Sequence, residues 1–150
     1  MALKPHQKVI QDDINFACST VANKGYVVMY TTTGVAKSNN VGAGTKVAGF
    51  LMQDVVAGIH PSNINLGEET GTIDVARNFH KNQTHVSGVV RLMKHGELVT
   101  NAVSGTFAIG DIVRVQAGGQ IRVGGAGEVV GHALSTKDTD GYVKVYVNIA

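Results

Sequence analysis

Histidine is the residue type in this chain that could most directly bind a metal ion. The six histidines are His6, His60, His80, His85, His95 and His132. A zinc site needs about four nitrogen, sulfur or oxygen ligands that converge on one point. The close pair His80 and His85 would lie on opposite faces of a strand and off a common helical face. No carboxylate or cysteine completes a ligand set, so the sequence predicts surface or loop histidines and no metal site.

The sequence offers equally few candidate residues for nucleophilic or acid-base catalysis. The single cysteine, Cys18, is the candidate nucleophile, but its flanking residues match no signature of a catalytic cysteine. Asp12 and Asp13 are adjacent, so their side chains would project apart on either regular element, which does not suit paired acid-base work. The sequence predicts an inert or interface cysteine, solvated carboxylates and no enzyme activity.

Two glycine-rich loops, Gly42-Ala-Gly44 and Gly125-Ala-Gly127, could in principle surround a phosphate group. The dinucleotide-binding pattern Gly-x-Gly-x-x-Gly requires a third glycine and a helix that begins there. Val47 and Val130 occupy the position of the third glycine, and strands are predicted to follow. The glycines are therefore predicted to form turns.

Lys94 offers a different chemistry, as a site of covalent modification. Met93-Lys94, at the tip of a predicted hairpin, is similar to the lysine that biotinyl and lipoyl carrier domains present. The similarity covers this dipeptide and lacks the flanking residues of the family. An exposed lysine at a turn is the other interpretation, and the intact mass of the protein distinguishes the two.

Length and charge limit the partners that we expect. A chain of 150 residues fits one domain, which buries about 68–70% of its unfolded surface. The 13 basic and 11 acidic residues give a net charge of +2, too balanced for a general nucleic-acid binder. No window approaches the roughly 18 consecutive apolar residues of a membrane helix, and the first residues lack a signal-peptide pattern. We expect neither a nucleic-acid nor a membrane partner.

The elements that would position these residues are mainly strands. The chain has 19 glycines, two prolines and 43% hydrophobic residues, which favours short strands joined by tight turns. We expect about ten strands, almost no helix, and an all-β fold of the small barrel or sandwich type, similar to a β-tulip. The main predicted strands are 26–31, 35–37, 45–56, 70–76, the hairpin 86–103 that turns at Lys94-His95-Gly96, and 142–147.

Residues 1–24 are polar, lack the later alternation and are predicted to form an extended N-terminal arm. An apolar spacing from Val9 to Ala17 could form one face of a short helix, but Phe16 interrupts it. Helical and extended arms both stay open. The rest of the chain, residues 25–150, is predicted to form a single β domain.

A glycine-punctuated strand pattern occurs twice within that domain, over residues 25–56 and 109–134. In the first unit an alternating run leads through glycine-rich turns to Lys46-Val-Ala-Gly49-Phe-Leu-Met52. In the second unit a similar run leads to Glu128-Val-Val-Gly131-His-Ala-Leu134. Two similar β units predict one small barrel or sandwich with its function on the surface.

The second unit also carries a family resemblance. Gly110-Asp-Ile-Val-Arg-Val115, the Glu128–Leu134 segment and Gly141-Tyr-Val-Lys-Val-Tyr-Val147 resemble the small β domains of tailed-bacteriophage capsid decoration, or cement, proteins. The first unit shares the resemblance more loosely, and its Gly49–Val55 segment is similar to a Gly-x-Leu-x-x-Asp-Val stretch of those proteins. The shared patterns are spacings of glycine and hydrophobic residues, and no catalytic motif accompanies them.

The resemblance implies a non-enzymatic structural protein of the virion that needs no cofactor. Such a protein is made in the host cytoplasm, binds the outside of the capsid and bridges subunits of the major capsid protein. The arm residues expected to contact the capsid are Val9, Ile10, Ile14 and Phe16. Cement proteins usually lie on symmetry axes, which implies a homodimer or a homotrimer. The residues expected to mediate self-association are Phe50, Met52, Leu92 and Met93.

Two other functions stay open. Another structural phage component, such as the base of a head fibre or a tail-associated module, would present the same β pattern. The carrier domain with Lys94 modified is the alternative from a different class of protein.

Overall fold

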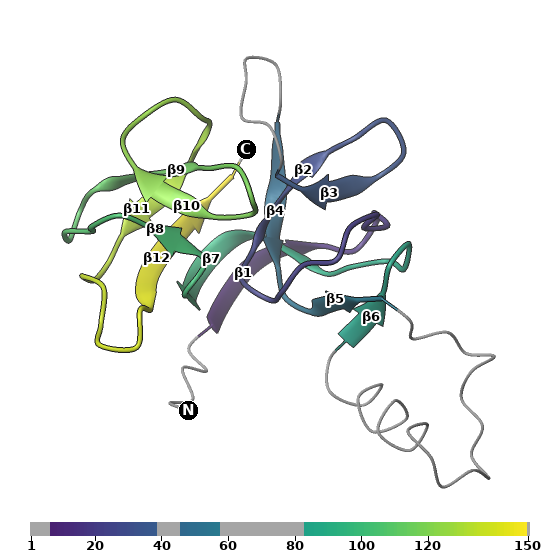
Figure 1. Cartoon of the computed structure of the whole chain (residues 1–150), viewed down its shortest axis with the longest axis horizontal. Coiled ribbons are helices and arrows are strands. Elements are labelled where there is room, and N and C mark those ends of the chain that lie inside the picture. Colours follow the sequence, from purple (N-terminus) through teal and green to yellow (C-terminus); the bar gives the residue numbers. More distant parts are fainter. Residues whose placement is uncertain (1–6, 39–45, 58–82, 150) are drawn as a thin grey trace, which may run out of the picture.

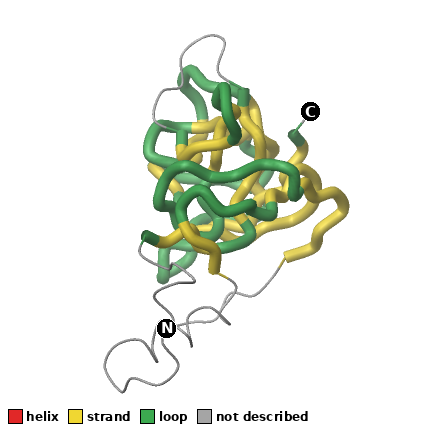
Figure 2. The backbone as a smooth tube through the Cα atoms, turned by 90° about the vertical axis from the view of Figure 1, so that its right-hand side faces the viewer, coloured by secondary structure: helices red, strands yellow, loops and turns green. Residues whose placement is uncertain are grey.

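The computed structural model describes residues 7–38, 46–57 and 83–149, which form strands, turns and bends but no helix (Figure 1, Figure 2). This confirms the predicted all-β class. The predicted strand 70–76 lies outside the described residues. The strands are β1 (Gln7–Asp13), β2 (Val27–Tyr30), β3 (Val35–Lys37), β4 (Val47–Leu51), β5 (Asp54–Val56), β6 (Gln83–His85), β7 (Leu92–Thr100), β8 (Val103–Ser104), β9 (Ile112–Val115), β10 (Ile121–Val123), β11 (Val129–Ala133) and β12 (Val143–Asn148).

Most of these strands belong to one curled sheet that forms a half-barrel, consistent with a small barrel or sandwich. The hydrogen-bonded order is β3-β2-β4-β7-β12-β11-β9-β10-β8, and β1 pairs with β7 beside this path. Within this sheet only β10 and β8 run parallel among the described strands. A second, two-stranded sheet joins β5 to β6.

The two predicted β units have the same strand arrangement. In the first unit β2 is central and pairs with β3 and β4. In the second unit β9 is central and pairs with β10 and β11. All four pairings are antiparallel, and both units have a register shift where the central strand meets the third strand. The units therefore have the same local topology as well as a similar sequence.

The main-chain hydrogen bonds of the two units also correspond. The N–H of Gly25 donates to the carbonyl of Leu51, as that of Gly110 does to Ala133. The N–H of Leu51 donates to Tyr26, as that of Ala133 does to Asp111. The N–H of Tyr30 donates to Lys46, as that of Val115 does to Glu128. Gly25 and Gly110 begin the turn into the central strand with φ of +88° and +89°. Only glycine adopts this conformation without strain, which explains why each unit begins with one.

The third strand of each unit also contains a glycine, but for a different reason. A neighbouring strand approaches so closely there that a side chain would not fit. A Cβ atom on Gly49 would lie 3.0 Å from the carbonyl oxygen of Met93 in β7. A Cβ atom on Gly131 would overlap the carbonyl oxygen of Tyr146 in β12. These glycines allow each unit to pair with one of the two strands at the middle of the sheet.

Two groups of buried side chains fill the fold. The larger core, which includes Phe50 and Val145, lies between the first unit and the inner face of the second. The smaller core includes Leu51 and lies on the opposite face of the first unit. Successive residues of β2 alternate between them, since Val27 belongs to the larger core and Val28 to the smaller. The first unit is therefore buried on both faces.

The predicted hairpin over residues 86–103 is wrong. Residues Leu92–Thr100 form the single continuous strand β7, and the expected turn residue Gly96 lies inside it, in register with Val9 of β1 and Val147 of β12. The predicted strand 45–56 is also interrupted: bends at Met52 and Gln53 separate β4 from β5.

The N-terminal segment is extended, not helical; the sequence had left both interpretations open. It packs against the β domain. Strand β1 pairs with β7 from Gln7 to Asp13. Beyond it, Cys18 and Ala22 are buried in the smaller core and form bridges to Val35 and Val55. The boundary predicted at residue 24 therefore does not separate an arm from a domain, because the core includes residues before it.

Replacing Gly131 by alanine is expected to lower the free energy of unfolding by about 3 kcal/mol, since the added Cβ must displace the β12 backbone. Gly105→Ala is the control, because Gly105 has φ of +82° and open space around it, so only backbone strain of about 1 kcal/mol is expected. Urea unfolding measures both variants. Equal losses of stability would contradict the close-approach explanation.

Candidate functional site

The predicted capsid-contact residues divide into two kinds in the structure. Ile10 and Ile14 are exposed by 55% and 62%. Ile10 lies at a register shift of β1, where it has no partner in β7. Val9 packs against the larger core and Phe16 against the smaller one, so both are partly buried. Ile10 and Ile14 are available for contact with a partner, whereas Val9 and Phe16 mainly stabilise the chain itself.

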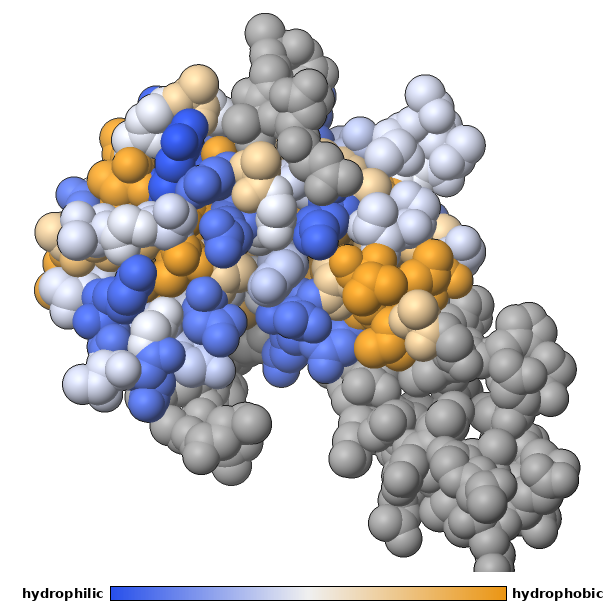
Figure 3. Space-filling model, viewed as in Figure 1, coloured by the Kyte–Doolittle hydropathy of each residue, from blue (hydrophilic) through white to orange (hydrophobic). Residues whose placement is uncertain are grey.

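Ile14 is one of three exposed aliphatic side chains on the segments that cover the smaller core, a group that sequence reasoning did not find. The other members of this group are Val21 and Val89, which are exposed by 49% and 59%. They lie on the two neighbouring segments that cover the smaller core, 14–22 and 86–90. Figure 3 shows hydrophobic surface on this side of the molecule, next to the place of β5 in Figure 1. We call Ile14, Val21 and Val89 the apolar patch.

Backbone hydrogen bonds hold these two segments together. The N–H of Cys18 donates to the carbonyl of Gly88 at 3.1 Å, and the N–H of Val90 donates to the carbonyl of Phe16 at 3.0 Å. The Nε atom of Arg91 lies 2.5 Å from Asp12, an exposed ion pair worth at most about 1 kcal/mol. The apolar patch therefore has a fixed backbone beneath it, which limits the entropy lost on binding.

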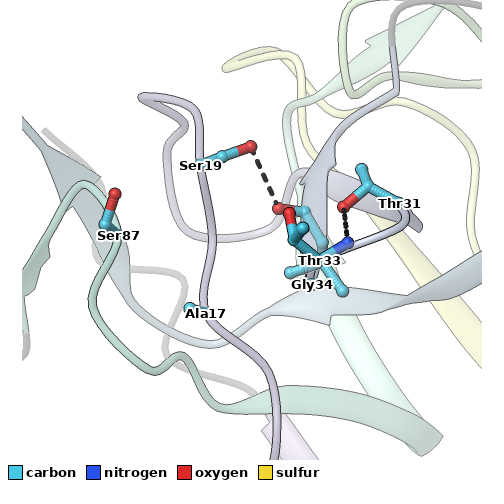
Figure 4. Close-up of a pocket in the computed structure, with 7 residues that line it drawn as sticks. Ala17, Ser19, Thr31, Thr33, Gly34 and Ser87 are labelled. Carbon is cyan, nitrogen blue, oxygen red and sulfur yellow. Dashed lines mark hydrogen bonds between the residues drawn. The ribbon is translucent and has the colours of Figure 1, made fainter.

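A small pocket of about 210 Å³ lies between the same segments and the turn after β2 (Figure 4). Its polar side chains are the hydroxyls of Ser19, Thr31, Thr33 and Ser87. Thr31 Oγ1 already accepts a hydrogen bond from the N–H of Thr33 at 3.3 Å. Among the described residues, no titratable side chain lines this pocket. It offers a neutral notch for a small group, without the acid, base or charge that most catalysis needs.

Lys94 does not lie at an exposed tip. It is in the middle of β7, and its side chain is only 15% exposed. Its Nζ atom donates to Tyr30 Oη at 2.7 Å and lies 3.9 Å from Asp13 Oδ2. The geometric basis for the carrier-domain alternative is therefore wrong, because a carrier lysine must reach a modifying enzyme.

The predicted self-association residues are also misplaced for that role. Phe50, Leu92 and Met93 have no exposed surface, and Met52 is 5% exposed, all within a single chain. They form the cores on the two faces of the first unit. Apolar residues on strands near the centre of a sheet usually belong to the core of the chain itself. Association between two copies of the chain would have to use other side chains.

The remaining candidates for chemistry do not gather into one site among the described residues. Cys18 is buried, and its Sγ donates to the carbonyl of Thr20 at 3.4 Å. His95 and His132 both contact Tyr146, but in the part of the chain that the structure describes no three His, Cys, Asp or Glu residues gather in a metal-binding group. His6, His60 and His80 lie outside the described residues.

Comparisons with known proteins add no assignment. Neither a scan against models of protein families nor a search of curated proteins found a match to this chain. Among residues 7–38, 46–57 and 83–149, no helix is long and apolar enough to cross a membrane.

Lys94 is expected to react more slowly with an acetylating reagent than Lys137, because its amine is partly buried and bonded to Tyr30, whereas Lys137 is exposed. Peptide mass spectrometry over a time course of labelling measures both rates in the folded protein. The two lysines should react alike after unfolding in urea. Equal rates in the folded protein would contradict the geometry described for Lys94.

Proposed function

We propose that this chain is a capsid decoration protein of a tailed bacteriophage, a structural protein of the virion that binds the outside of the head. The family resemblance of residues 109–147 suggests this class of protein. The observation that carries the proposal is the apolar patch on a hydrogen-bonded backbone, beside a pocket without titratable groups. These features suit binding to another protein surface.

The apolar patch can supply useful affinity. Burial of a valine or isoleucine side chain contributes about 1.5–3 kcal/mol, and Ile14, Val21 and Val89 are each about half exposed in the isolated chain. Part of this gain offsets the entropy lost on association. A head presents many identical sites, so a modest contact to the major capsid protein is repeated over the whole particle.

Stabilisation then follows from mass action. A protein that binds only the assembled capsid shifts the equilibrium towards assembly, and a protein that contacts neighbouring subunits resists their separation. No catalytic group or cofactor is required for this activity. A rigid sheet with surface contacts is sufficient, and the duplicated β units provide such a sheet.

The base of a head fibre or a tail-associated module would use the same physical features. Location on the particle separates these functions. Decoration of the head predicts label over the whole head surface, whereas a fibre base or a tail module predicts label at a few points or on the tail. Immunogold electron microscopy of purified virions of the phage that encodes the chain gives the answer. Absence of the chain from those virions would contradict all three.

Particles that lack the chain are expected to release their genome at a lower temperature than complete particles. Packaged DNA exerts outward stress on the capsid, and loss of the external contacts lowers its resistance to that stress. Release of DNA on heating is followed with an intercalating dye, and adding back the purified protein should restore the original temperature. Equal release with and without the chain would remove the cement function.

A double variant Ile14→Asp with Val89→Asp is expected to lower the affinity for heads by at least about a hundredfold, because two carboxylates would be desolvated in the contact. Ile109→Asp is the matched control, since Ile109 is 75% exposed and lies away from the patch, in the turn that begins the second unit. Co-sedimentation with heads measures binding, and thermal unfolding checks that each variant is folded. Unchanged binding of the double variant would rule out the apolar patch as the contact.

A further inference from the structure

The two β units differ in how their corresponding faces are covered. Five positions on one face of the first unit and its neighbour β7 are at most 5% exposed: Val27, Met29, Val47, Phe50 and Met93. The matched hydrogen bonds and strand registers place these positions in correspondence with Ile112, Arg114, Val129, His132 and Tyr146 around the second unit. None of these five counterparts is buried.

The reason for the difference is the stacking of the units. The face of the first unit packs against the inner face of the second, and together they form the larger core. The outer face of the second unit has no such cover among the described residues, where Ile112 is 56% and Val129 43% exposed. The outer face of the second unit therefore corresponds to a face that is buried by packing in the first unit, yet it is open to a partner.

The side chains on this outer face are arranged as a fixed cluster. Ile112, His132 and Tyr146 occupy neighbouring register positions on β9, β11 and β12. Tyr146 Oη lies 2.6 Å from His95 Nε2, and the ring of Tyr146 lies 5.1 Å from that of His132. An ordered tyrosine loses little entropy on binding and is a common centre of protein interfaces.

The outer face also has positive charge that the described residues do not neutralise. Arg114 and Arg122 are in register on β9 and β10. They donate to the successive carbonyls of Gly127 and Ala126, at 2.9 and 3.0 Å, which places the two like charges near each other. Within the described ranges neither arginine has a carboxylate partner. Arg122 Nε is itself buried without a hydrogen-bond partner, so the terminal nitrogens of its guanidinium would have to make any contact. Lys144, by contrast, is paired with Glu97 at 3.4 Å.

We propose that this outer face, centred on Ile112 and Tyr146 with Arg114 and Arg122 beside them, is a second docking surface. Its occupant is an acidic protein surface that presents Asp or Glu side chains to the two arginines. The inference rests on the proposed function, in which that surface belongs to a capsid subunit. Figure 1 places the second unit and the side that carries the apolar patch at different ends of the molecule, so the two surfaces suit a bridge between neighbouring subunits.

The test uses the full chain and heads purified from particles that lack it. Arg114→Gln with Arg122→Gln is expected to lower the affinity by about tenfold and to weaken its dependence on salt, because charge pairs with the partner are lost. Ile112→Asp should also lower the affinity by about tenfold, through desolvation of its carboxylate and repulsion by the acidic partner. Lys137→Gln and Ile109→Asp are the controls for charge and for exposed apolar surface, and thermal unfolding checks the fold of every variant.

The outcomes separate the two proposals. Wild-type binding with reduced affinity and a reduced salt dependence in the double arginine variant supports the second surface. Wild-type binding with variants that behave like their controls overturns the second surface and leaves the proposed function intact. Failure of the wild-type chain to bind heads overturns the proposed function and, with it, this occupant.

Discussion

The pairing of β7 with three other strands is the interaction on which the rest of the fold depends. Strand β1 follows β7 from Leu92 to Leu98, while β4 meets its first two residues and β12 meets residues 95–100. A strand has only two edges, so β4 and β12 must follow one another along the edge opposite β1. The sheet divides at Lys94, between the two contacts. This division directs the first and second units to different sides and produces the curl that encloses the larger core.

The same division explains why two similar units end in different environments. Each unit uses the glycine of its third strand to approach one strand of the central pair, Gly49 towards β7 and Gly131 towards β12. The inner face of the second unit closes over the first, and the segments 14–22 and 86–90 close over the other side. After these contacts the outer face of the second unit has no further element to cover it among the described residues. Similar sequences thus produce one unit that is mainly structural and one with a free surface.

Local patterns in the sequence predicted what depends on local geometry. The alternation of apolar and polar residues predicted β12. The repeated glycines predicted the two units, because tight turns and the close approach of strands require glycine. Long-range pairing was not predictable in this way. Gly96 was assigned to a turn because glycine usually marks one, yet here it lies in register with valines on both sides. Residues 14–22 lack periodicity, since isolated bridges to Val35, Val55 and Val89 hold them instead of a regular strand. The apolar patch depends on that pairing and has no signature of its own.

In the described part of the chain, the groups that could react differ in kind from the groups that stay free. Lys94 and Cys18, which could react, are partly buried and bonded internally or fully buried, and the described residues that line the hydroxyl pocket include no titratable side chain. The groups that keep free capacity are different in kind: half-exposed aliphatic side chains on one side, and two arginines without carboxylate partners among the described residues on the other. Apolar surface supplies affinity without direction, whereas guanidinium groups select the orientation and the charge of a partner. A rigid sheet that separates these two kinds of contact can engage two neighbours at once, and the strength of such a bridge depends on the sheet holding the surfaces at a fixed distance.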